Sequence, residues 1–541
     1  MTSDTRASWL RRHSCSLALG LIVLLGGFLR FLLIGTKTIW LDEAVAIWEA
    51  HHGLRESWYW LTQVEFHPPV YFALLHVWQG ICGDQPTATR ALSAVCGTLT
   101  LPLFFGVARR LTDRPVALLA TFFLAISPFH VRFAQEARMY ALLALGVSVS
   151  LYLLSRILFD QEGRPRFWLG LALSETVVML THNMGLLFPL ALNVGVLGAV
   201  AYQAKTGRAT SFPIADVWAF GRRWVKYQAL ALLLWLPWLV PLVRQTHTLS
   251  QRYWLPFPSA RIVWRAIENF NFSSIPRGFP YLSYWIALYL LLAFAGVISL
   301  RRQKATAILL LSLFLVPIAA EVLISLKRPM FLDRTLIGAT LTYYLLIAAG
   351  IRGVGRGLWP ASALEEQRPE GRGRWVRGVL FGAQATLIAV VVALTCFALK
   401  HYYFDYKKEE WATAARFVAR RLQPGDLVVF NTALGQAPFE YYFRDYHKQV
   451  EMRGLPVDLA ERRVPEPTMT AEDIPDARRL LQDRARVWLV YSHESYTDPD
   501  RLVWRVLREQ MRPGETRGFV GLKVVLFERK QDAGVSSTRA Q

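Results

Sequence analysis

Cysteine is scarce in this chain, and basic residues outnumber acidic ones. The four cysteines are Cys15, Cys82, Cys96 and Cys396, and none lies beyond residue 400. A disulfide framework is therefore excluded there, and no cysteine spacing fits a zinc site. The 40 Asp and Glu residues face 61 Lys and Arg residues, which gives a formal net charge of +21. Such a surplus of basic residues is typical either of a nucleic-acid-binding protein or of a membrane protein with basic links on one side. The distribution of the basic residues along the chain distinguishes the two.

The basic residues gather in short links between long apolar runs. Runs of roughly 17 to 25 apolar residues recur through the first 400 positions, which is the length that crosses a bilayer. Lys and Arg fill the links, for example at 109–114 and 301–304. This pattern is typical of a multi-pass protein in membrane lipid, so we expect no nucleic-acid partner. The expected spans are 15–35, 86–108, 115–132, 140–158, 167–183, 185–203, 226–243, 282–300, 305–326, 334–351 and 378–399.

The segment 70–82 decides the sidedness of every later link. It is apolar but short, and it contains His76 and Gln79. If it does not cross the membrane, the basic links fall inside, apart from 244–281, as the positive-inside rule requires. We therefore interpret 70–82 as an amphipathic helix on the outer surface, in an α-helical polytopic protein of about eleven spans. Four polar segments then share the outer face: the first outer loop 36–85 and the links at 133–139, 181–183 and 327–334.

The residues from 401 to 541 form a second domain after the membrane domain 1–400. They are rich in charge, and their apolar segments are short. Helical spacing at 409–422 precedes a turn and a buried-strand pattern at 427–430. Strands are expected at 487–491 and 520–527, with a helix at 499–511. The sequence predicts a small extracytoplasmic α/β domain.

Two adjacent carboxylates, Asp42 and Glu43, follow the first span. One interpretation is a helix cap, because Asp and Glu suit the first turn of a helix. The other is chemical: an Asp at the membrane boundary can act as a general base, and charges at membrane depth are usually functional. The sequence leaves both open.

Cationic and polar groups occur in the other outer segments. The link at 133–139 holds Glu136 and Arg138 and is followed by Tyr140. An Arg there is either paired with Glu136 or a bidentate ligand for phosphate. Lys327, Arg328 and Arg334 form a second basic cluster. Two explanations are open: the long basic side chains reach towards the lipid headgroups, or they bind a lipid phosphate.

Two histidines complete the set of candidate substrate-binding residues. His67 opens the surface segment ahead of two prolines, which suit a first helical turn in any case. His182 lies in the link at 181–183 and is either a satisfied polar residue or a substrate contact. Glu65 and His67 are too few to establish a metal site, so no metal ligand is assigned.

The order of these motifs resembles a known superfamily. Residues 15–350 look like the C-type glycosyltransferases, in particular bacterial proteins similar to the family 39 protein mannosyltransferases and to the aminoarabinose transferases that modify lipid A. The segments that carry the resemblance are 41–43, 67–71, 127–128, 135–140, 181–182 and Arg334, and the pattern at Trp411 and 424–426 resembles the soluble tail of these proteins.

The resemblance implies an inner-membrane enzyme of bacteria that uses a polyprenyl-phosphate sugar donor and inverts the anomeric carbon. It places the catalytic Asp at Asp42 and the phosphate-binding Arg at Arg138, with Arg334 as second candidate. His67 departs from the aminoarabinose transferases, which carry Lys there, and this leaves the acceptor and any divalent metal open.

The expected partners are the lipid-linked donor and a hydroxyl-bearing lipid, glycan or protein. The main alternative is a lipid or sugar transporter or flippase without transferase chemistry. An oligosaccharide polymerase or ligase that uses a diphosphate lipid, and a non-catalytic assembly protein, are further alternatives.

Overall fold

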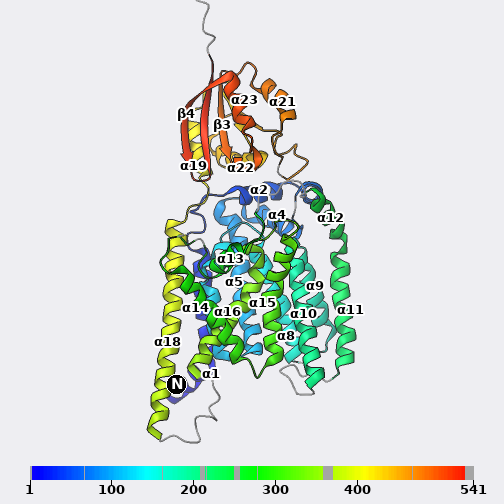
Figure 1. Cartoon of the computed structure of the whole chain (residues 1–541), viewed down its shortest axis with the longest axis vertical. Coiled ribbons are helices and arrows are strands. Elements are labelled where there is room, and N and C mark those ends of the chain that lie inside the picture. Colours follow the sequence, from blue (N-terminus) through cyan, green and yellow to red (C-terminus); the bar gives the residue numbers. More distant parts are fainter. Residues whose placement is uncertain are drawn as a thin grey trace, which may run out of the picture.

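A long helical bundle carries a small α/β domain at one end (Figure 1). The computed structural model describes residues 3–65, 67–160, 162–206, 214, 216–248, 256–273, 275–276, 278–356, 370–465 and 467–530. The strands of the described residues all follow residue 400. The protein is a multi-pass membrane protein, and the α/β domain meets only one end of its bundle.

Nine helices within the described residues are long and apolar enough to cross a membrane, or ten crossings if one bent pair is counted. The predicted span 167–183 is the 15-residue helix α9, which is shorter than these and packs between α8 and α11. The long helices are α1 (Ser3–Phe31), α5 (Pro86–Leu111), α8 (Tyr140–Phe159), α10 (Leu187–Thr206), α11 (Val217–Trp235), α14 (Leu282–Ser299), α15 (Lys304–Ser325), α16 (Ile337–Arg356) and α18 (Glu370–Lys400), and the shorter helices of the bundle are α9 (Pro165–Met179), α12 (Leu239–Thr248) and α13 (Ala260–Phe272).

The predicted continuous span 115–132 is a bent pair, α6 (Arg114–Ile126) and α7 (Pro128–Ala134), with 55° between them. Pro128 has no N–H to donate, so carbonyls at the end of α6 lose their helical partner. The buried Arg30 of α1 donates to the carbonyls of Ala125 (3.0 Å) and Leu124 (3.3 Å) instead. An apolar surrounding requires such a partner. The bend directs α7 towards the link at 135–139.

The first polar loop forms a layer of short helices between the bundle and the α/β domain (Figure 1). It contains α2 (Leu41–His51), α3 (Leu54–Tyr59), the π-helical turn η1 (Trp60–Val64) and α4 (Val70–Cys82). The helix predicted at 70–82 is confirmed with the same bounds. The N–H of Val70 donates to the carbonyl of Leu180 (3.1 Å), and His76 contacts the carbonyl of Ala50 (2.7 Å). These contacts join α4 to the link after α9 and to α2.

The C-terminal domain is a five-stranded mixed sheet in the order β2-β1-β3-β5-β4. β2, β1 and β3 are parallel, whereas β5 is antiparallel to both β3 and β4. The predicted strand 427–430 is confirmed, but the expected helix 499–511 ends at Gln510 because Met511 begins β4. The elements are α19 (Trp411–Arg421), β1 (Leu427–Phe430), α20 (Gln436–Phe443), β2 (Glu451–Gly454), α21 (Ile474–Leu481), β3 (Arg486–Ser492), α22 (Glu494–Thr497), α23 (Leu502–Gln510), β4 (Met511–Phe519) and β5 (Leu522–Arg529).

Helix α2 belongs to both parts of the molecule. Its apolar residues Leu41, Val45 and Ile47 share one hydrophobic core with Trp411 and Trp488 of the C-terminal domain, whereas Ala46 and Ala50 of the same helix pack into the core of the bundle. A helix with opposite faces in two cores has little freedom to move. Any side chain on α2 is therefore fixed relative to both the bundle and the domain.

Candidate active site

Asp42 lies in the first turn of α2, at the end of the bundle that faces the C-terminal domain. Its Oδ2 atom is 3.3 Å from Nη1 of Arg334, and the Asp42 side chain keeps 25% of its surface exposed. The N-cap of α2 is Trp40, so Asp42 is the second helical residue and not the cap. The carboxylate contacts a cation from the far end of the chain and still reaches solvent.

Arg138 is held beside Asp42 by a tight link. Its own N–H donates to the carbonyl of Glu136 (2.8 Å), which fixes the turn. Its guanidinium donates from Nη1 to the backbone carbonyl of Asp42 (3.2 Å) and from Nη2 to Nε2 of His67 (2.9 Å). The buried Nε has no hydrogen-bond partner among the described residues. Arg138 therefore contacts Asp42 and keeps its Nε–H donor for another partner, and the structure describes no ion pair between Arg138 and Glu136.

Arg334 enters from the other side of the site on the 3₁₀ turn η4 (Asp333–Leu336). Its guanidinium carbon lies 5.5 Å from the Tyr140 ring centre and 6.0 Å from that of Trp40. Behind the turn, the buried Glu321 accepts from the N–H of Leu332 (2.9 Å) and the hydroxyl of Thr335 (2.7 Å). Nε of Arg334 is also buried without a hydrogen-bond partner in the described part of the chain.

His67 and His182 are both neutral in this arrangement. Arginine always donates, so Nε2 of His67 accepts from Arg138, and Nδ1 of His182 accepts from the N–H of Met184 (3.0 Å). Burial, then the nearby charge of Arg138, holds the pKa of His67 well below its ordinary value and lowers the pKa of His182 to about 3. The two rings lie 5.9 Å apart.

The cluster carries an excess of positive charge. Arg138 and Arg334 bring two positive charges and Asp42 one negative charge, while His67 and His182 stay neutral. One positive charge remains uncompensated within the cluster, in a position largely removed from water. Guanidinium groups with unused N–H donors match phosphate oxygens. The arrangement can therefore bind an anion next to a carboxylate.

Glu43 and Glu136 lie behind this cluster in a buried charge network. Glu43 is fully buried, and Arg90 donates to both of its oxygens at 2.7 Å. Lys408 donates to Glu43 (3.0 Å) and lies 3.7 Å from Glu136, which Arg132 also contacts at 3.2 Å. Neither carboxylate is exposed to a substrate. Both instead fix the segments that carry Asp42 and Arg138.

Lys327 and Arg328 do not join the cluster through any contact that the structure describes. Arg328 donates to the carbonyl of Thr246 in α12, and Lys327 is exposed. Their predicted contact with a lipid phosphate stays a prediction, and only Arg334 of that basic group reaches Asp42.

Glu49 and Glu65 form a second pair of neighbouring carboxylates. Glu65 forms an ion pair with Arg462 of the C-terminal domain, and Arg462 also lies over the Trp48 and Trp60 rings. Burial, then the charge of Glu65, raises the pKa of Glu49 well above its usual value. Within the described residues no three His, Cys, Asp or Glu side chains converge as metal ligands. Glu65 is paired with an arginine and makes no contact with His67 that the structure describes.

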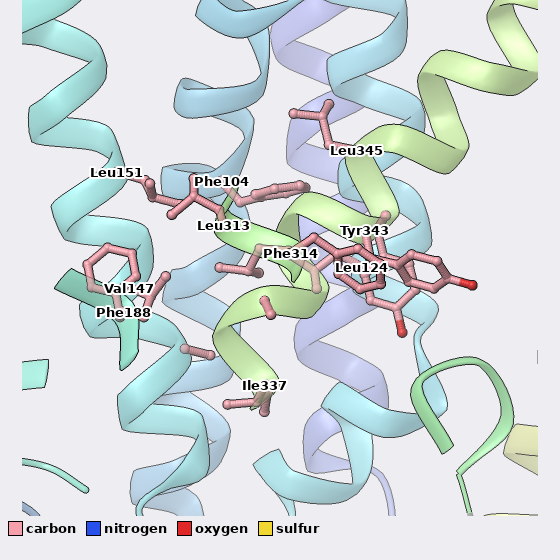
Figure 2. Close-up of a cluster of buried hydrophobic side chains, with 14 of the residues drawn as sticks. Phe104, Leu124, Val147, Leu151, Phe188, Leu313, Phe314, Ile337, Tyr343 and Leu345 are labelled. Atoms are coloured by element: carbon pink, nitrogen blue, oxygen red, sulfur yellow. The ribbon is translucent and has the colours of Figure 1, made fainter. Parts of the chain in front are cut away.

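An apolar pocket opens beside the cluster. It begins at Thr335 and Leu336, next to Arg334, and at Met184, two residues after His182. Its other lining residues come mainly from α8, α10 and α15, and Figure 2 shows four of them, Val147, Leu151, Phe188 and Leu313, within a cluster of buried hydrophobic side chains. The pocket is thus lined mainly by apolar side chains, and two of its lining segments directly follow Arg334 and His182 in the chain.

Sequence reasoning missed Arg90, Lys408 and Arg462. Arg90 had a usable signal, because a charge inside an apolar run requires a buried partner. Lys408 and Arg462 are ordinary basic residues of a charged domain, and only the docking of that domain on α2 and η1 buries them.

Comparison with known sequences finds a match over the first half of the bundle. Residues 66–240 match the dolichyl-phosphate-mannose-protein mannosyltransferase family. Dolichyl-phosphate-mannose–protein mannosyltransferase 4 of Saccharomyces cerevisiae is 23% identical over 187 residues, or 31% of this chain. The match spans 24% of the yeast protein.

Comparison with solved structures extends the likeness to nearly the whole chain. ArnT from Cupriavidus metallidurans in the apo state superposes with a TM-score of 0.59 at 15% identity, covering 95% of this chain and 98% of ArnT. The same protein bound to undecaprenyl phosphate gives 0.57 at 15% identity, with 94% and 97% covered. The Archaeoglobus fulgidus oligosaccharyltransferase in the apo form gives 0.57 at 14% identity, with 95% and 75% covered.

Proposed function

We propose that the chain is a membrane glycosyltransferase of the C-type superfamily that transfers a sugar from a polyprenyl-phosphate donor to a hydroxyl group of an acceptor, which the family match over residues 66–240 and the likeness of its fold support. One observation carries this proposal: Arg138 and Arg334, each with a buried Nε donor that has no partner among the described residues, contact Asp42, and an apolar pocket begins at the residues that follow Arg334.

The donor fits the site in two parts. Its phosphate lies between Arg138 and Arg334, where one positive charge is uncompensated. Its polyprenyl chain enters the pocket that begins at Leu336 and continues along Val147 and Leu313. Undecaprenyl phosphate, which the similar ArnT binds, has this combination of an anionic head and an apolar chain.

The transfer proceeds in one displacement that inverts the anomeric carbon. Phosphate binding gives Arg334 a second anion to contact, which leaves Asp42 available to the acceptor. Asp42 takes the proton of the acceptor hydroxyl as its oxygen attacks the anomeric carbon from the face opposite the phosphate. The bond from that carbon to the phosphate oxygen breaks, and its electron pair leaves with the phosphate. Arg138 and Arg334 stabilise the added negative charge.

The remaining predicted site residues act by placing these groups. His67 accepts from Arg138 and aligns it, Tyr140 packs beside the Arg334 guanidinium, and His182 packs beside the Tyr140 ring. Glu43 and Glu136, through their buried ion pairs, fix the positions of the segments that carry Asp42 and Arg138. The basic links, which the positive-inside rule places in the cytoplasm, support a reaction at the outer face of the membrane, and the resemblance to bacterial enzymes supports the inner membrane of a bacterium. Acceptors then approach from the extracytoplasmic side, where the C-terminal domain lies.

The test is sugar transfer by the purified protein in lipid nanodiscs, with a radiolabelled sugar on a polyprenyl monophosphate and with the same sugar on a diphosphate. We expect turnover with the monophosphate lipid and a loss of at least about 10²-fold in Asp42→Asn. Asp405→Asn, at a carboxylate with 51% exposure, is the matched control. Arg138→Ala and Arg334→Ala should weaken binding of the polyprenyl phosphate itself.

The alternatives give different outcomes in the same assay. Turnover of Asp42→Asn within a few-fold of the parent rejects Asp42 as the base. Preference for the diphosphate lipid identifies an oligosaccharide polymerase or ligase. Movement of the labelled lipid between leaflets without transfer of its sugar identifies a flippase.

A further inference from the structure

The helix that carries Asp42 begins without a cap of its own. Trp40 occupies the N-cap position in an extended conformation, and its side chain makes no capping hydrogen bond. The first N–H groups of a helix have no partner within the helix, so a buried helix start needs one from elsewhere. The start of α2 is buried, with Leu41 5% exposed.

Glu409, which lies 368 positions further along the chain, supplies that partner. The N–H of Leu41, the first residue of α2, donates to Oε2 of Glu409 at 3.1 Å. Its negative charge also lies at the positive end of the helix dipole. The preceding residue Thr38 donates its hydroxyl to the backbone carbonyl of the same Glu409 (2.6 Å). Glu409 thus contacts both the segment that enters α2 and the first N–H of the helix.

The C-terminal domain fixes the Glu409 side chain from three directions. Nε1 of Trp411 donates to its Oε2 at 2.6 Å. Nε2 of His493, at the end of β3, lies 3.2 Å from its Oε1. Gly521, in the turn between β4 and β5, closes the third side, because a Cβ atom there would lie 2.7 Å from Cγ of Glu409. The Glu409 carboxylate is therefore set by the domain and not by the bundle.

We propose that Glu409 is a positioning residue that caps the catalytic helix from outside it, so that the docked C-terminal domain is a structural part of the active site. The inference rests on the proposed function, in which Asp42 is the base. Asp42 lies one residue after the capped N–H, so fraying of this turn moves the carboxylate away from Arg334. The phosphate-binding arginines lie on other elements and touch α2 only at Asp42, so we expect loss of the cap to affect them less than it affects the Asp42 carboxylate.

The contact has a matched control next to it in the chain. Glu410 also uses its carboxylate to accept a backbone N–H, that of Val520, at 2.9 Å. This hydrogen bond joins α19 to the turn of the β4–β5 hairpin and does not involve α2. Glu410→Ala therefore removes a comparable hydrogen bond from the same domain and leaves the helix cap intact. Glu409→Gln retains an acceptor oxygen and should restore part of what Glu409→Ala loses.

The experiment measures three quantities on the full-length protein in nanodiscs for the parent, Glu409→Ala, Glu409→Gln and Glu410→Ala. They are hydrogen–deuterium exchange of the peptide that covers residues 38–46, kcat for sugar transfer, and binding of the polyprenyl phosphate by thermal shift. In Glu409→Ala we expect exchange about fivefold faster in that peptide, a drop in kcat of about tenfold, and unchanged lipid binding. Glu410→Ala should leave the exchange of 38–46 and kcat at the parent values.

The outcomes separate this proposal from the function on which it rests. Unchanged exchange of residues 38–46 in Glu409→Ala overturns the cap, and so does equal loss in Glu409→Ala and Glu410→Ala. Faster exchange with an unchanged kcat overturns the link between the cap and catalysis. If Asp42→Asn itself retains turnover, the proposed function fails, and the exchange data alone still decide whether Glu409 caps α2.

Discussion

Replacing Glu43 by Gln should destabilise the protein more than any exposed carboxylate change on the same loop. Glu43 is fully buried, and both of its oxygens accept from Arg90, with Lys408 at one of them and the N–H of Ala137 at the other. The amide has no charge and cannot accept at its nitrogen. The substitution therefore leaves Arg90 and Lys408 buried with one negative charge fewer.

The magnitude follows from the electrostatics of the site. Burial alone would raise the pKa of Glu43, but the charges of Arg90 and then Lys408 outweigh burial and lower the pKa to about 2 from its ordinary value of 4.5. A shift of one pKa unit corresponds to about 1.4 kcal/mol, so the charged form contributes about 3 kcal/mol to folding at neutral pH. This value agrees with the cost of removing one partner of a buried ion pair, which is about 3 to 5 kcal/mol.

The same shift fixes the pH dependence of the effect. Because the folded-state pKa is depressed, the contribution of Glu43 is complete above the unfolded value of about 4.5 and is lost as the pH falls towards 2. About 2 kcal/mol of it should be gone by pH 3. The difference in stability between the parent and Glu43→Gln should therefore be largest at neutral pH and shrink in acid.

The assay is denaturant titration in detergent micelles at pH 7 and at pH 3, followed by tryptophan fluorescence. Glu56→Gln is the matched control, since Glu56 lies on the same loop with 59% of its side chain exposed. It should change stability by less than about 0.5 kcal/mol. Equal stability of the parent and Glu43→Gln at pH 7, or a difference that does not shrink at pH 3, would refute the assignment of Glu43 as a buried anion.

Two further predictions concern helix packing and histidine protonation. Gly350→Ala should cost about 1 to 3 kcal/mol, because its Cβ would lie 1.9 Å from the carbonyl oxygen of Leu292 in α14; Gly382→Ala in α18, where a Cβ meets nothing within 4 Å, should be neutral in the same titration. Burial, then Arg138, depresses the pKa of His67, so protonation favours the unfolded chain and stability falls as the pH drops below about 6.5. In His67→Gln the stability curve between pH 6.5 and 5 should be flatter than in the parent, and an unchanged slope contradicts this.

The sequence predicted the bundle better than the details of its helices. Apolar runs of membrane-spanning length are a strong signal, and the basic links indicated which polar segments share one end. The contacts of Asp42 with Arg334 and of His67 with Arg138 confirm that these segments meet. The break before Pro128 was missed because an apolar run continues across it, and the compensating Arg30 lies in another helix.

In the candidate site too, some residues could be predicted from the sequence and others could not. Residues beside the predicted spans, such as Asp42, Arg138 and Arg334, could be selected because a charge there is costly and needs a reason. Their supports could not be selected. Lys408 and Glu409 are two charged residues in a charged stretch, and nothing in their sequence neighbourhood distinguishes them from Lys407. Their importance arises only when the C-terminal domain docks on α2, a contact between segments more than 350 residues apart.

This docking also constrains how an acceptor reaches Asp42. Domains joined by a linker usually move relative to one another. Here α2 contributes Leu41 and Val45 to the core of the C-terminal domain while Ala46 packs in the bundle, so a swinging motion would pull one core apart. Separation would also expose the buried Lys408 without its partner Glu43. The acceptor must then enter with the domain docked, through the side on which Asp42 keeps a quarter of its surface exposed. An inter-domain cross-link that locks α20 to α2 should therefore leave transfer intact, and loss of activity in the locked protein would show that the domain has to swing open.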